Sequence, residues 1–149
     1  SRPHDYVDSA LNCKGDDNDL YTCGPHQGAP LLNIRLGEEQ FLFDRLGASF
    51  YLLYFTDAHA VPGDIQAQVQ ALREQGVPLQ VLAVTGNRQG AISGADEVID
   101  DHSGHLRSKY GANAGSAYLV RPDQHVCARW QHLSGQALRA AIVTALGNE

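Results

Sequence analysis

The three cysteines are the residues with the most obvious chemistry in this sequence. Cys13, Cys23 and Cys127 are an odd number, and none belongs to the C-x-x-C pair that a dithiol oxidoreductase or a zinc knuckle uses. A disulfide framework therefore has little support, and a reducing compartment fits this usage best. Cys127 alternates with apolar neighbours and is expected to be a buried, inert thiol.

A group of histidines and acids could hold a metal ion. His102 and His105 are three positions apart beside Asp100 and Asp101, and this spacing can place two ligands on one face of a helix. The competing interpretation is a solvated first helical turn whose acids suit the helix dipole. The sequence favours this second interpretation.

Two further polar groups have a functional and an ordinary interpretation. Asp57 and His59 resemble a carboxylate-oriented histidine for acid–base catalysis, but no nucleophile is nearby in the sequence, so a loop pair is favoured. The acidic run at 16–19 lacks the glycine and the later glutamate of an EF-hand. A solvated loop is therefore expected there.

The elements that must position these residues begin with a strand–helix–strand unit. Residues 50–55 form a continuous apolar run, which is typical of a strand covered on both faces of a largely parallel sheet. Pro62 starts a segment with Ile65, Val69 and Leu72 on one helical face, and Gly76 ends it. A second buried strand follows at 79–84, so the two strands should be parallel with a right-handed crossover.

The second half of the chain predicts a short strand, a helix, a hairpin and a last helix. Residues 97–99 lead to Asp100 and Asp101, which can cap a helix that Gly111 ends. Strands at 117–121 and 125–130 flank a turn at 122–124, and Ser134 caps the final helix. The expected fold is α/β and thioredoxin-like, with a mixed central sheet flanked by helices.

The predicted hairpin carries the only tryptophan. Trp130, Ala128 and Val126 should share one strand face, with Trp130 and Val126 packed against the C-terminal helix. Cys127 should then lie on the opposite face, since strand side chains alternate.

The redox site of a thioredoxin fold is missing from this pattern. The loop at 56–62 contains no cysteine at the place where a helix N-terminus would stabilise a thiolate. The approach to the third core strand at 114–117 contains no proline. Thiol–disulfide and peroxide chemistry are therefore disfavoured.

The first part of the chain has a different character. Residues 1–27 are rich in Asp, Asn, Gly and Pro without periodicity, so we expect an irregular arm or interdomain connector before a thioredoxin-like domain at 28–149. That domain should begin with a strand at 31–36 and a helical turn at 41–46.

The charge and hydropathy of the sequence argue against nucleic-acid and membrane partners. The formal net charge of −6 offers no basic stripe for nucleic acid, and no apolar run approaches the roughly 20 residues that span a bilayer. No nucleic-acid or membrane partner is expected, and a cytoplasmic location is the default expectation.

The predicted hairpin also carries a family resemblance. Residues 110–112, 117–126 with Val120-Arg121-Pro122-Asp123, and 128–130 resemble the C-terminal thioredoxin-like domain of flavin-dependent aromatic-ring hydroxylases, the phenol hydroxylase and 3-(3-hydroxyphenyl)propionate hydroxylase group. Residues 40–47 and the apolar strand from Phe50 are similar to the family's short helix and first core strand.

The resemblance implies a non-catalytic, structural or subunit-interface domain of a larger aromatic monooxygenase. In that family FAD, NAD(P)H and substrate are handled by upstream domains of the same chain, and this chain lacks the G-x-G-x-x-G fingerprint. The resemblance transfers no catalytic, cofactor-binding or metal residue to this sequence, and it makes a second copy of the chain a candidate partner in a homodimer.

Two alternatives stay open. One is a freestanding thioredoxin- or peroxiredoxin-like redox protein that uses Cys13 or Cys23. The other is a small-ligand or metal-binding module around His59, His102 and His105.

Overall fold

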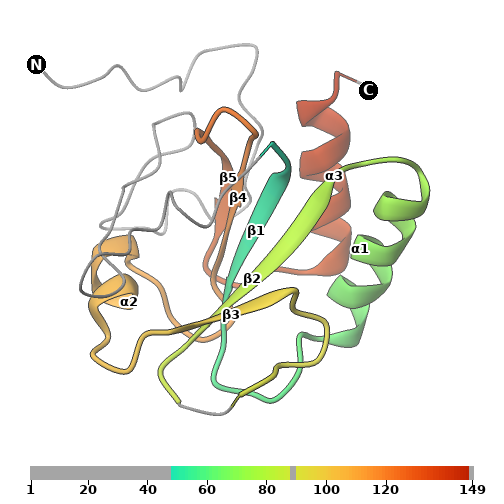
Figure 1. Ribbon diagram of the computed structural model, residues 1–149. Helices are drawn as coiled ribbons and strands as arrows, with labels where there is room; N and C mark the ends of the chain where they lie inside the picture. Colours follow the sequence, from blue (N-terminus) through green and yellow to red (C-terminus); the bar gives the residue numbers. More distant parts are fainter. Residues whose placement is uncertain (1–47, 88–89, 148–149) are drawn as a thin grey trace, which may run out of the picture.

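A five-stranded mixed sheet with helices on both faces organises the chain (Figure 1). The structure is a computed structural model and describes residues 48–87 and 90–147. The strand order is β3-β2-β1-β4-β5, with β1, β2 and β3 parallel and β4 and β5 antiparallel to their neighbours. The expected α/β class and mixed sheet are confirmed. The elements are β1 (Phe50–Phe55), α1 (Gly63–Glu74), β2 (Leu79–Thr85), β3 (Glu97–Asp100), α2 (His105–Tyr110), β4 (Ala117–Val120), β5 (Val126–Trp130) and α3 (Gly135–Ala145).

Strand β1 lies at the centre of the sheet and is buried on both faces. It pairs in parallel with β2 and antiparallel with β4, so neither edge meets solvent. Leu52 and Tyr54 belong to the apolar cluster under α1 and α3, while Leu53 and Phe55 belong to the cluster on the α2 side. This two-sided burial explains why the strand sequence is apolar at every position.

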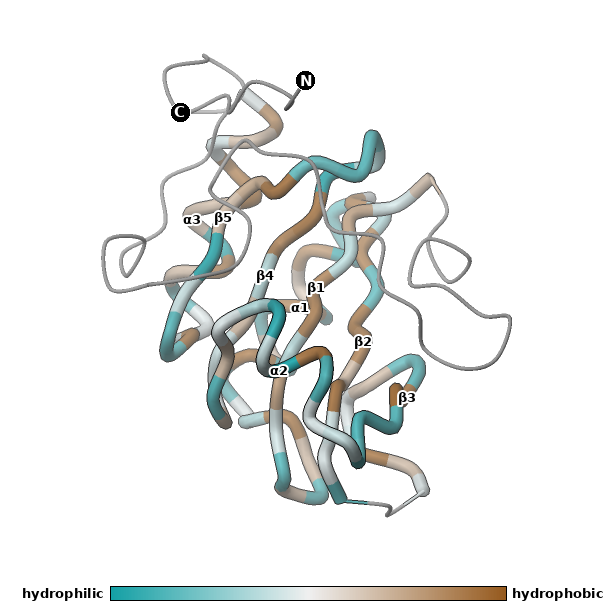
Figure 2. The backbone as a smooth tube through the Cα atoms, turned by 90° about the vertical axis from the view of Figure 1, so that its left-hand side faces the viewer, coloured by the Kyte–Doolittle hydropathy of each residue, from teal (hydrophilic) through white to brown (hydrophobic). Residues whose placement is uncertain are grey.

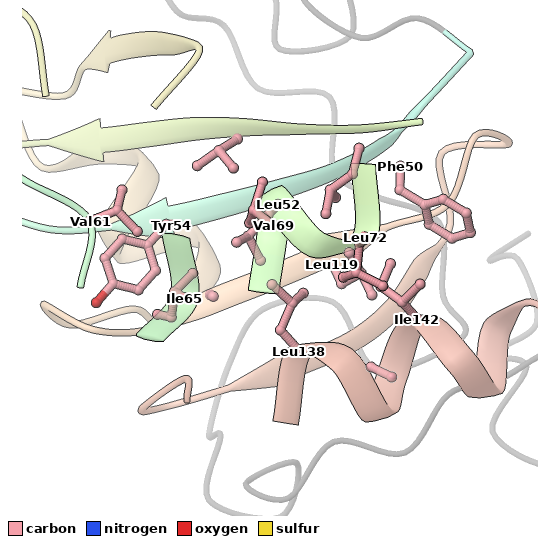
Figure 3. Close-up of a cluster of buried hydrophobic side chains, with 14 of the residues drawn as sticks. Phe50, Leu52, Tyr54, Val61, Ile65, Val69, Leu72, Leu119, Leu138 and Ile142 are labelled. Carbon is pink, nitrogen blue, oxygen red and sulfur yellow. The ribbon is translucent and has the colours of Figure 1, made fainter. Parts of the chain in front are cut away.

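The larger apolar cluster joins the sheet to α1 and α3 (Figure 3). The buried residues of α1 are the predicted Ile65, Val69 and Leu72. Leu138 and Ile142 of α3 face them across the cluster in Figure 3. Both predicted amphipathic helices are confirmed, and they cover the same face of the sheet (Figure 1).

The N-termini of α1 and α3 meet closely. The Ser134 hydroxyl accepts a hydrogen bond from the Ala137 amide at 3.1 Å, so the predicted cap of the last helix is confirmed. The Gly135 amide donates to the Asp64 carboxylate of α1 at 2.8 Å. A β-carbon on Gly135 would lie 2.4 Å from the Asp64 carbonyl oxygen, so only glycine fits at this contact.

The opposite face of the sheet is covered in part by the short helix α2 (Figure 2). Leu106 and Tyr110 are its buried residues, as the sequence predicts. Tyr118 of β4 donates its hydroxyl hydrogen bond to the Tyr110 carbonyl at 2.6 Å, and the two rings stack edge to face at 5.0 Å. Burial raises the pKa of Tyr110 far above its ordinary value, and Tyr118 raises it further.

The hairpin of β4 and β5 is confirmed, and so is the shared face of Ala128 and Trp130 under α3, but the predicted faces of Val126 and Cys127 are wrong. Leu119 pairs with Ala128 and Val120 pairs with Val126, so Cys127 is an extra residue in β5. This β-bulge breaks the alternation. Val126 therefore lies in the α2-side cluster, whereas Cys127, Ala128 and Trp130 lie together in the cluster under α3.

Several sequence-based expectations are not tested by the described residues. The arm at 1–27, the strand at 31–36 and the helical turn at 41–46 fall outside the described residues. The likeness to thioredoxin itself stays a prediction. In the described part of the chain, no helix has both the length and the apolar character to cross a membrane.

Candidate functional site

The loop after β1 is the place where a thiol-based site would lie in the predicted fold. Because β1 and β2 are parallel, their carboxyl ends meet at one edge of the sheet, where open α/β sheets bind ligands. Thr56 turns the chain there by accepting a hydrogen bond from the Ala58 amide at 3.0 Å. The residue enclosed by this turn is Asp57, whose carboxylate is exposed.

Asp57 ties three segments together. One of its carboxylate oxygens accepts hydrogen bonds from the Arg107 guanidinium at 2.6 Å and from the Gly86 amide at 3.3 Å. The Asn87 side-chain amide donates to the Asp57 carbonyl at 3.3 Å. The loop after β1 is thus fastened both to the end of β2 and to α2. These contacts position a carboxylate but supply no nucleophile.

Arg107 is the ion-pair partner of Asp57. Its side chain is 24% exposed, and its Nε is a buried nitrogen that has no hydrogen-bond partner among the described residues. The two residues are fifty positions apart, so no local pattern connects them. His59, the partner considered from the sequence, is exposed in the same loop, and Asp57 pairs with Arg107 instead.

The histidines and acids near α2 do not form one site. Asp101 is buried and accepts hydrogen bonds from the amides of Leu106 at 2.9 Å and Arg107 at 3.1 Å. Asp101 therefore satisfies two amides of the first turn of α2 from outside the helix. The N-cap residue itself is Gly104, and the first turn of α2 contains no acid, so the predicted N-cap position and the expected solvated acidic turn are wrong. His102 and His105 are exposed. Across residues 48–87 and 90–147, no three His, Cys, Asp or Glu side chains are grouped to hold a metal ion.

The segment before β4 closes the other side of the same sheet edge. The Gly115 amide donates to the Phe55 carbonyl at 2.7 Å, and the Phe55 amide donates to the Ser116 carbonyl at 2.9 Å. The buried Ser116 hydroxyl donates to the Gln131 carbonyl at 3.0 Å. The described part of the chain contains no cis peptide bond. Backbone pairing thus holds the position where redox members of the predicted fold have a cis-proline.

The turn of the hairpin has the geometry that its sequence predicts. The Arg121 guanidinium pairs with the Asp123 carboxylate at 3.1 Å, and Asp123 also accepts a hydrogen bond from the His125 amide at 3.2 Å. Burial alone would raise the pKa of Asp123, but hydrogen bonding and charge from Arg121, then from His125, hold the pKa below its ordinary value. The turn is a fixed, charged feature rather than a reactive one.

Cys127 departs from its expected state. Its side chain is fully buried, as predicted, but it is disulfide-bonded rather than a free thiol. The expectation that disulfides have little support is wrong at this position, because cysteine spacing along the sequence does not reveal which chain segments meet in space.

The first turn of α1 does not fit a dinucleotide diphosphate. In dinucleotide-binding folds the diphosphate rests on glycine amides at the N-terminus of the helix after the first strand. Here the first turn of α1 carries the Asp64 carboxylate, which the Gly135 amide binds. A negative charge at that point repels a diphosphate.

Solved structures of several enzymes contain a domain with a similar fold. The substrate-free rebeccamycin biosynthetic enzyme RebC matches with a TM-score of 0.65 and 21% identity, over 99% of this chain and 23% of that chain. Aklavinone-11 hydroxylase in complex with FAD and aklavinone matches with a TM-score of 0.65 and 25% identity, over 93% of this chain and 25% of that chain. The fold is that of a domain found in flavin-dependent monooxygenases.

The flavin-dependent monooxygenase PieE, in complex with FAD and substrate, matches with a TM-score of 0.57 and 24% identity, over 87% of this chain and 21% of that chain. This chain therefore spans about a quarter or less of each of these enzymes. No protein-family model matches the sequence, and no curated protein matches it.

Proposed function

We propose that this chain is a non-catalytic C-terminal domain of a larger FAD-dependent monooxygenase that hydroxylates an aromatic substrate. The observation that carries the proposal is the extent of the similarity. It covers 99% and 93% of this chain in RebC and aklavinone-11 hydroxylase, but only 23% and 25% of those enzymes. A match of this form is expected for one domain of a longer enzyme. The hairpin with Arg121, Pro122 and Asp123 supports the same family.

The geometry at the sheet edge supports a structural role. The loop after β1 presents Asp57 in an ion pair with Arg107 where a redox enzyme of the predicted fold would need a thiolate. The first turn of α1 carries the Asp64 charge where a diphosphate would bind. FAD, NAD(P)H and the aromatic substrate would then bind to upstream domains, and this domain would contribute to contacts with those domains or with a second subunit.

A freestanding thiol–disulfide protein is the second candidate, and the disulfide of Cys127 is the observation that favours it. Such a protein needs an accessible thiolate that attacks a substrate disulfide. Cys127 is fully buried, which opposes this role.

Insulin reduction and peroxide consumption by the chain test the choice between these two functions. The proposed domain has no turnover above that of buffer in either assay. Turnover that Cys13→Ser or Cys23→Ser abolishes would establish the redox protein instead. Ser9→Ala in the same part of the chain is the matched control, because it removes a hydroxyl and no sulfur.

A further inference from the structure

We draw no further inference here: the strongest candidate, the small cavity between α1 and the loop before β3 that Gln66, Gln70 and Arg73 line, carries nothing because each of these side chains already binds another residue of the chain and none of them points to a ligand.

Discussion

The contact between the first turns of α1 and α3 can be tested with two glycines that occupy equivalent places. Gly135 is the first residue of α3, and Gly63 is the first residue of α1. A β-carbon on Gly135 would lie 2.4 Å from the Asp64 carbonyl oxygen, whereas a β-carbon on Gly63 meets no atom within 4 Å. Ordinary contact begins near 3.4 Å, so Gly135→Ala must push the two helices apart by about 1 Å.

The expected magnitude follows from three contributions. Overpacking costs about 1–3 kcal/mol, and weakening of the hydrogen bond from the Gly135 amide to Asp64 costs about 1 kcal/mol. Replacing a helical glycine by alanine offsets up to about 1 kcal/mol. Gly135→Ala should therefore lower the free energy of unfolding by roughly 1–4 kcal/mol, while Gly63→Ala should leave it unchanged or raise it by up to about 1 kcal/mol.

Urea unfolding measured by tryptophan fluorescence provides the assay, because Trp130 is the only tryptophan and is 1% exposed. Two variants of equal stability would refute the reasoning, since they would show that α1 and α3 do not meet at Asp64.

Three further predictions follow from single contacts. Trp130→Ala should destabilise the fold by about 3–5 kcal/mol, whereas Leu146→Ala, at a side chain 45% exposed, should cost less than about 1 kcal/mol; a nearly neutral Trp130→Ala in thermal unfolding would contradict the core assignment. A double-mutant cycle of Asp57→Asn and Arg107→Gln should give a coupling of about 0.5–1 kcal/mol that high salt reduces, and additive effects would argue against the ion pair. The lowered pKa of Asp123 means that its contribution to stability is present above its unfolded pKa of about 3.9 and is lost as pH falls through the folded value. The stability difference between wild type and Asp123→Asn should therefore be present at about pH 5 and shrink as the pH falls below about 4. A difference that grows between about pH 4 and about pH 2 would contradict the assigned sign.

The elements that the sequence predicts correctly are those whose signal is local. The apolar run of β1 reflects burial on both faces, and the faces of α1 and α3 follow from helical spacing. Ser134 was identifiable as the cap of α3 because a cap and its amides are neighbours in sequence. The hairpin was predictable because its turn residues stand together.

The errors arise where distant residues or one extra residue decide the structure. The bulge at Cys127 shifts the register of β5, so side chains before and after it do not follow one alternating pattern. Alternation along the sequence cannot reveal such an extra residue. The pair of Asp57 and Arg107 joins a loop to a helix across fifty positions. The disulfide of Cys127 likewise depends on which segments meet in space. The bonds of Asp57 and Cys127 were therefore not predictable from the sequence.

The flavin content of two proteins, measured after gel filtration, tests the proposed function most directly. One is this chain alone, and the other is the longer protein encoded with the sequence upstream of it. We predict no bound flavin in the chain and about one FAD per subunit in the longer protein, as expected when a separate dinucleotide-binding domain holds the cofactor. A flavin spectrum that stays with this chain, or a longer protein that binds no flavin, would contradict the account.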